Sequence, residues 1–164
     1  MTSAPLALHR GEDEVPFVEL ADQGLGPSLR IQLLHADVEA GVWVIRARFD
    51  PGMVVPTHKH TGVVHAFTLA GRWKYAEYPE VNTAGSYLFE PAGSVHTLTV
   101  PADNDELTDV WFAISGANLN LDGDGNVVDV VDAGTIAERY LAACAAAGLE
   151  RPDVIGRSQG GSNT

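Results

Sequence analysis

Short runs of strand-forming residues, separated by glycine and proline, constrain the fold of this 164-residue chain more than any other feature. No helical pattern lies between these runs, and regularly spaced short strands predict an antiparallel barrel or sandwich. With 45% apolar residues the chain can bury one core, so we expect a single all-β domain. The eight runs cover residues 29–34, 42–49, 63–69, 72–77, 86–89, 95–100, 107–115 and 127–130.

One helix is predicted near the end of the chain, over about residues 135–147. Thr135 and Glu138 have the spacing of a capping box, and Gly148 is a natural stop. One face of the helix is apolar and should pack on the barrel or on a partner subunit. We therefore expect a flexible N-terminal arm, a barrel, a C-terminal helix and a flexible tail, at residues 1–15, 16–132, 133–150 and 151–164 respectively.

Composition excludes several classes of function. The net charge is −12 and the ten basic residues are scattered, which argues against nucleic-acid binding. The apolar runs are too short to span a bilayer, and the N-terminus does not have the layout of a signal peptide. We expect a cytoplasmic protein without membrane contact. A lone cysteine, Cys144, agrees with this, since it cannot form an internal disulfide.

Three of the six histidines occupy positions that favour metal binding. His58 and His60 are two residues apart, so on a strand both side chains project to the same face. His96 follows the turn Pro91-Ala-Gly93 and begins a returning strand. A single histidine on a strand is usually structural, but the combination of pair and turn predicts one metal ion held by all three. Three neutral imidazoles with open positions suit Fe(II), Zn or Ni.

These histidine segments resemble the two motifs of the cupin superfamily. The first motif is matched by Gly52, His58, His60 and Gly71, and the second by Gly85, Pro91, Gly93 and His96. The resemblance implies a jelly-roll β-barrel with a metal centre inside. Two positions depart from the pattern, since Val64 stands at the place of the usual glutamate ligand and Val100 at that of the closing asparagine. The departure at Val64 leaves a three-histidine site.

A narrower similarity is to the 2,4'-dihydroxyacetophenone dioxygenases and the acetylacetone-cleaving dioxygenases. It extends over about residues 16–149, through the segments 51–66, 71–75, 85–91 and 94–97. The resemblance implies an oxidoreductase with non-haem Fe(II), which uses O2 as co-substrate to cleave a C–C bond. The substrate would be a small β-diketone or α-hydroxyketone chelated to the metal, its negative charge standing in for the missing carboxylate. We also expect a homodimer or homotetramer.

Two glutamates are candidates for further roles at the metal. Glu90 resembles a site glutamate of the acetylacetone-cleaving relatives, where it could accept the acidic proton of the substrate or orient a water. The alternative is an exposed carboxylate at a strand end. Glu77 shares a strand face with Trp73 and Tyr75 and could be an extra metal ligand, or else an outward charge. His65 is expected to turn away from the metal because its neighbours face it.

The substrate pocket is expected to be lined by apolar side chains. Alternation does not decide whether Trp111 or Phe112 points inward, and Arg72 is either a pocket cation that holds an enolate or a solvated strand residue. Such a lining suits a small aromatic or aliphatic ketone. The pocket residues we single out are Val64, Phe67, Arg72, Leu98 and Trp111.

Two other functions stay open from the sequence. One is a Zn-dependent isomerase, cyclase or hydrolase that acts on an enolisable substrate, with the metal as Lewis acid. The other is a non-catalytic cupin that binds a small ligand. The chain has no DNA-binding appendage, which weakens the second of these.

Overall fold

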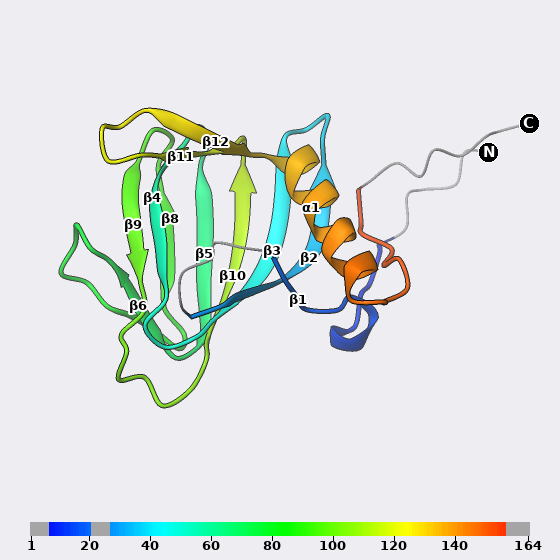
Figure 1. The fold of residues 1–164 in the computed structure, drawn as a ribbon, viewed down its shortest axis with the longest axis horizontal. Helices are drawn as coiled ribbons and strands as arrows, with labels where there is room; N and C mark the ends of the chain where they lie inside the picture. The colour runs from blue at the N-terminus through cyan, green and yellow to red at the C-terminus, as the bar shows by residue number, and fades with distance from the viewer. Residues whose placement is uncertain (1–6, 21–26, 157–164) are drawn as a thin grey trace, which may run out of the picture.

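Two six-stranded antiparallel sheets form the body of the molecule in a computed structural model, which describes residues 7–20 and 27–156 (Figure 1). The first sheet has the strand order β1-β2-β3-β10-β5-β8 and the second β12-β11-β4-β9-β6-β7. The first sheet consists of β1 (Val18–Glu19), β2 (Leu29–Asp37), β3 (Val42–Phe49), β10 (Thr108–Ser115), β5 (Val64–Ala70) and β8 (Tyr87–Glu90). The second consists of β12 (Val127–Val131), β11 (Asn118–Leu121), β4 (Val54–His60), β9 (Val95–Thr99), β6 (Arg72–Tyr75) and β7 (Asn82–Thr83).

The predicted all-β architecture is confirmed, and most predicted runs coincide with strands. The strand β3 has the predicted bounds and the predicted alternation, with Trp43, Ala47 and Phe49 buried in the core. Four strands were not among the eight runs: the two-residue strands β1 and β7, and the longer strands β4 and β11. The strand β4 is interrupted by Pro56 and ends in His-Lys-His, and β11 reads Asn-Leu-Asn-Leu without a β-branched residue, so neither has the usual pattern of a strand. Both strands gain their order from pairing with each other, with Asn118 opposite His60.

The N-terminal segment packs on the first sheet. Val15 is fully buried, and the Gln32 side chain donates hydrogen bonds to the carbonyls of Glu12 and Val15. The Glu12 carboxylate pairs with Arg46 and Arg48, which stand on the outer face of β3. The flexible arm expected over residues 1–15 is therefore wrong for residues 12–15, and residues 1–6 lie outside the described part of the chain. Residues 12–14 form a single 3-10 turn, η1 (Glu12–Glu14).

The helix α1 (Ala133–Ala146) begins two residues earlier than predicted. Its N-cap is Asp132, whose carboxylate accepts a hydrogen bond from the Thr135 amide, while the Thr135 hydroxyl accepts one from the Asp132 amide. Thr135 is thus the third helical residue, and Glu138 takes no part in the cap. The helix packs against β2 beside the β11–β12 hairpin (Figure 1), and it buries Ile136, Tyr140 and Cys144.

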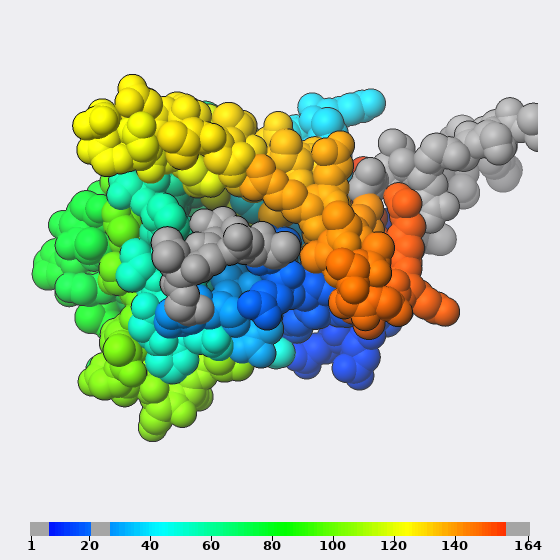
Figure 2. Space-filling view, in the orientation of Figure 1, coloured from blue at the N-terminus to red at the C-terminus, as the bar shows by residue number. Residues whose placement is uncertain are grey.

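The chain continues past α1 along the first sheet. Ile155 forms a parallel bridge with His35, so residues 151–156 of the expected tail are part of the packed structure. Residues 157–164 lie outside the described part. In the space-filling view, the β11–β12 hairpin (yellow) and α1 (orange) lie next to each other along one border of the visible face (Figure 2). None of the helical segments in residues 7–20 and 27–156 is long and apolar enough to cross a membrane.

Candidate metal centre

The strands β4 and β9 bring the three predicted ligands together between the two sheets. His58 and His96 are direct cross-strand partners, and His60 lies two residues further along β4 on the same face. The ring centroids are 4.9–5.0 Å apart, and one nitrogen of each ring lies within 4.8 Å of the others. All three rings are buried. The structure therefore assembles His58, His60 and His96 into one cluster that can hold a metal ion.

The His58 ring is prepared for metal binding by its surroundings. Its Nδ1 lies 2.9 Å from the carbonyl oxygen of Pro56, which can only accept, so Nδ1 carries the proton and Nε2 is free. Burial, helped by the nearby His60 and His96 rings, lowers the pKa of His58 to about 4 against the opposing effects of Pro56 and Glu90. The ring is neutral at neutral pH, as a metal ligand must be.

Glu90 restores a carboxylate at the place left vacant by Val64. In the pairing of β5 with β8, Val64 and Glu90 are direct cross-strand partners, so the Glu90 side chain projects to the same inner face. Its Oε2 lies 2.8 Å from Nε2 of His60 and 3.2 Å from Nε2 of His96. Glu90 is only 3% exposed, which excludes the exposed carboxylate considered from the sequence.

The Glu90 carboxylate thus lies beside the histidine cluster, where its negative charge stabilises a cation held by the three rings. Neither approach of Oε2 has hydrogen-bond geometry, and the buried atoms His60 Nδ1, Glu90 Oε2 and His96 Nε2 have no hydrogen-bond partner. Two of these atoms, Glu90 Oε2 and His96 Nε2, lie 3.2 Å apart, and such buried unpaired atoms are costly unless a cation lies beside them, so the residues present fit a metal ion.

The Glu90 carboxylate is ionised. Burial by itself would raise the pKa of Glu90, but the His60 and His96 rings beside it outweigh burial and hold the pKa well below its usual range. The centre thus presents the neutral His58 ring and the negative charge of Glu90.

Tyr75, on β6, completes this arrangement and was missed as a site residue. Its ring stacks on the His96 ring at a centroid distance of 3.7 Å and an angle of 11°. Its hydroxyl donates a hydrogen bond to Oε1 of Glu90, and burial together with Glu90 raises the pKa of Tyr75 well above its usual value. The alternation Trp73-Tyr75 placed this ring inward, but nothing in the sequence joined it to Glu90.

Glu77 is not brought to the metal centre, contrary to the possibility raised from the sequence. The strand β6 ends at Tyr75, so the alternation used to place Glu77 inward does not extend to it. Glu77 is exposed, and its Oε2 accepts a hydrogen bond of 3.0 Å from the Thr97 amide. His65 also faces outward, as expected, and its Nδ1 is hydrogen-bonded to the Tyr87 hydroxyl at 2.8 Å.

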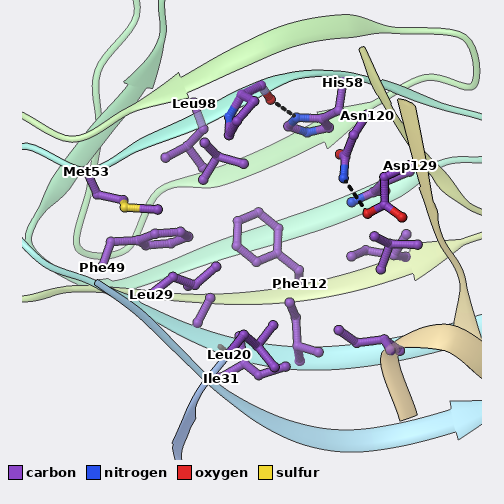
Figure 3. Close-up of a pocket in the computed structure, with 18 of the residues that line it drawn as sticks. Leu20, Leu29, Ile31, Phe49, Met53, His58, Leu98, Phe112, Asn120 and Asp129 are labelled. Atoms are coloured by element: carbon purple, nitrogen blue, oxygen red, sulfur yellow. Dashed lines mark hydrogen bonds between the residues drawn. The ribbon is translucent and has the colours of Figure 1, made fainter. Parts of the chain in front are cut away.

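A cavity of about 730 Å³ opens beside the histidines. Most of its lining is apolar. Figure 3 shows Phe49, Met53, Leu98 and Phe112 among the apolar side chains that line it. The side chains of His58, Asn120 and Asp129 lie on another wall (Figure 3). The volume and lining are typical of sites for small organic ligands.

Only part of the predicted lining is correct. Leu98 lines the cavity. Val64 is buried opposite Glu90 and does not reach the cavity. Phe67 and Trp111 are paired across β5 and β10 with both side chains on the outer face of the sheet, so Phe112 is the residue that points inward. Arg72 is exposed and binds Asn104 and Asp103 at the surface, which rules out the pocket cation.

The wall formed by β11 contributes polar groups that sequence reasoning missed. Asn120 donates to Asp129 at 3.1 Å, and Arg139 holds the same carboxylate through two hydrogen bonds. Asn118 lies opposite His60, and its Oδ1 is buried without a hydrogen-bond partner. A buried acceptor without a partner beside the candidate metal centre is available to a bound ligand.

Comparisons with known proteins agree with this architecture. The family model described as the ChrR cupin-like domain matches residues 10–113. A protein of unknown function with a cupin-like fold from Ralstonia eutropha JMP134 is 34% identical, with a TM-score of 0.85 and 99% of each chain covered. An RmlC-like cupin from the same organism is 27% identical, with a TM-score of 0.80 over 88% of this chain and 91% of that one.

A more distant structure is an acetylacetone dioxygenase from Acinetobacter johnsonii. It is 19% identical, with a TM-score of 0.73, and the match covers 87% of this chain and 95% of that one. At this level of identity the likeness concerns the fold alone. No curated protein sequence matches the chain significantly.

Proposed function

The chain belongs to the ChrR cupin-like family, and we propose that it is a metal-dependent dioxygenase acting on a small ketone. The substrate is a β-diketone or α-hydroxyketone, and O2 cleaves one of its C–C bonds. The observation that carries the proposal is a buried His58–His60–His96 cluster that opens onto a largely apolar cavity. The fold shared with an acetylacetone dioxygenase supports it.

The three histidines would hold Fe(II), which supplies chelation of the substrate oxygens and activation of O2 when it is bound. The chain's own residues then have separate tasks. The apolar wall around Phe49, Leu98 and Phe112 receives the carbon skeleton and excludes water from it. A β-diketone yields a carboxylic acid and a 1,2-dicarbonyl compound, and an α-hydroxyketone yields two carboxylic acids, with both oxygen atoms of O2 retained in the products.

Glu90 accepts the acidic proton of the substrate. Its Oε2 has no hydrogen-bond partner, is ionised and lies next to the nitrogens of His60 and His96. Tyr75 holds the other carboxylate oxygen, which fixes the direction of the free one. The enolate formed in this way keeps its negative charge close to the metal position.

Oxygen consumption tests the proposal. Chain reconstituted anaerobically with Fe(II) should consume one O2 per substrate with members of a panel of β-diketones and α-hydroxyacetophenones, and ¹⁸O2 should label both products. Glu90→Gln should lower kcat by about 100-fold, within the range for a lost general base. Glu77→Gln, a matched change of an exposed carboxylate, should leave kcat unchanged. Absence of O2 uptake after iron reconstitution, in protein that binds zinc as purified, contradicts the proposal.

One observation favours a second candidate function. A buried ionised carboxylate beside a candidate metal centre is also suited to proton transfer at an enolisable carbon, as in a Zn-dependent isomerase. Analysis of the products under anaerobic conditions separates the two functions, because an isomerase converts its substrate without O2.

A further inference from the structure

The cavity beside the histidines is larger than a simple β-diketone requires. The smallest such ligand has about seven non-hydrogen atoms, and at roughly 30 Å³ for a water-sized group it takes up about 200 Å³. The cavity measures about 730 Å³, so this ligand would leave most of it empty. Unfilled space inside a folded domain costs stability, because the lining atoms lose packing contacts. The volume therefore indicates a ligand with a further group attached to the ketone.

The cavity extends from the metal centre across the inner face of the first sheet. Glu90 on β8 lines it at one side of the sheet, and Ile31 on β2 lines it at the other. These two strands are four places apart in the strand order, which is about 19 Å at roughly 4.8 Å per strand. Figure 3 shows Leu20 and Ile31 across the cavity from His58. The cavity is therefore long enough for a chain.

Apolar side chains line the cavity between these two sides. Alternate residues of β3 and β10 point inward, so Trp43 lies opposite Ile114 in register and Ile45 lies opposite Phe112. The Trp43 ring donates its only N–H to the carbonyl oxygen of Gly116 at 3.0 Å. These four side chains therefore offer no free hydrogen-bonding group, and what lies against them should be a hydrocarbon.

The charged side chains of the lining leave no partner for an anionic end group. Arg139 on α1 is the only lysine or arginine among the described residues that line the cavity. Its guanidinium already donates hydrogen bonds of 2.9 and 2.7 Å to the two carboxylate oxygens of Asp129. Glu19 also lines the cavity, and the whole chain has a net charge of −12. A carboxylate at the far end of a ligand would be repelled.

We propose that the ligand of this cavity is a ketone with an unbranched alkyl chain of about six to ten carbon atoms, apolar to its end. The inference rests on the proposed function, because it places the two substrate oxygens at the histidines. The alkyl chain lies against Trp43 and Phe112 and ends near Ile31. At about 1.2 Å per bond, ten extended carbon atoms cover about 12 Å, which fits the length left beyond the oxygens.

Calorimetric titration of the Zn(II)-loaded chain tests the proposal without turnover. The probes are 2,4-pentanedione, 2,4-nonanedione and 2,4-undecanedione, which differ only in chain length. Kd should fall about 4-fold for each buried methylene group, and so by at least about 50-fold from the first probe to the second. Replacing the terminal methyl group of 2,4-undecanedione by a carboxylate should raise Kd at least about 10-fold. Equal Kd values for the three diones, or equal binding of the carboxylate, would overturn the proposal.

Ile31→Phe tests where the alkyl chain ends. The larger side chain fills the far side of the cavity, so this variant should bind 2,4-undecanedione at least about 10-fold more weakly and 2,4-pentanedione as the wild type does. Ile155→Phe is the matched control, because Ile155 lies outside the cavity lining, and it should keep wild-type affinity for both. Unchanged or equally weakened binding of the two diones by Ile31→Phe would overturn the proposal. The wild-type series decides if Ile31→Phe does not fold.

Oxygen uptake separates this inference from the proposed function. A chain that binds the longer diones more tightly but consumes no O2 in its Fe(II) form would contradict the dioxygenase and support the alkyl-chain ligand. A chain that consumes O2 with equal kcat/KM for 2,4-pentanedione and 2,4-undecanedione would support the dioxygenase and overturn the alkyl-chain ligand.

Discussion

At the scale of single residues, the centre concentrates titratable groups where water does not reach them. His60, His96 and Glu90 are each 3% exposed or less, and each has a buried polar atom without a hydrogen-bond partner. Leaving such atoms unpaired costs on the order of 1–3 kcal/mol each. A bound cation removes this cost for Glu90 and His96, so metal binding and folding stability should be linked.

The pH dependence of metal-free protein follows from His58. Its pKa is about 4 in the folded chain against 6.5 as the ordinary value, so between these values the unfolded chain binds more protons. Stability should therefore be constant above 6.5 and fall by up to about 3 kcal/mol as the pH drops towards 4. The low pKa of Glu90 adds a further loss at lower pH. Urea unfolding across this pH range measures the loss of stability. A free energy of unfolding that stays constant below pH 6.5 contradicts the prediction.

Tyr75→Phe separates two effects of one side chain. The phenylalanine ring can still stack on His96, but Glu90 loses the hydrogen bond to its Oε1. We expect metal occupancy to stay normal and kcat to fall by about 10- to 100-fold, because the free oxygen is no longer held in place. Tyr75→Leu should lower the metal affinity as well. Wild-type turnover in Tyr75→Phe would show that the hydroxyl has no positioning role.

Asn118→Ala tests the amide beside the metal centre. The Oδ1 of Asn118 has no partner, so its removal should not destabilise the chain measurably. If this amide contacts the substrate, KM should rise by about 10-fold with little change in kcat, which corresponds to one lost hydrogen bond. Steady-state kinetics on a reactive ketone decides this, and an unchanged KM excludes the contact.

The histidines could be predicted from sequence because their positions depend on local rules. A pair two residues apart shares a strand face, and the turn at Pro91 and Gly93 returns the chain to deliver His96. The relation between Val64 and Glu90 depends instead on the register of β5 with β8, which are far apart in the chain. The residues alone therefore showed a missing carboxylate, and only the family resemblance pointed to Glu90.

At the scale of elements, strand β11 and helix α1 depart most from expectation. The polar alternation of β11 does not resemble a strand, yet it pairs with β4 and places Asn118 and Asn120 along the cavity. The boundary of α1 shifted because Asp132 is a better acceptor for the free amides of the first turn than the predicted Thr135. Helix ends are commonly misplaced by one or two residues for this reason.

The cap of α1 offers a direct test at this scale. Asp132→Ala removes the acceptor for the Thr135 amide and should lower the free energy of unfolding by about 1 kcal/mol. Glu138→Ala is the matched control, because Glu138 is the partner expected from sequence but is exposed and takes no part in the cap. The urea midpoint of Asp132→Ala should fall and that of Glu138→Ala should stay at the wild-type value. Equal losses in both variants would favour the capping box of Thr135 and Glu138 that the sequence predicted.

At the scale of the whole molecule, sheet composition and turn spacing were enough to predict one all-β domain with a late helix. They could not predict which strands lie at an edge or which outer face stays bare. Phe67 and Trp111 read as core residues, and both stand on the outer face because their neighbours on the strand point inward. The inner face carries the candidate metal centre and the cavity.

Metal content, measured by mass spectrometry of the elements, tests the central claim most directly. Chain purified without added metal and then loaded with Fe(II) should hold one ion per chain. His96→Ala should hold none while circular dichroism shows an intact fold, because His96 is the sole ligand from β9 and two histidines alone bind a metal ion too weakly to retain it. Normal occupancy in folded His96→Ala would contradict the assignment of the centre to His58, His60 and His96.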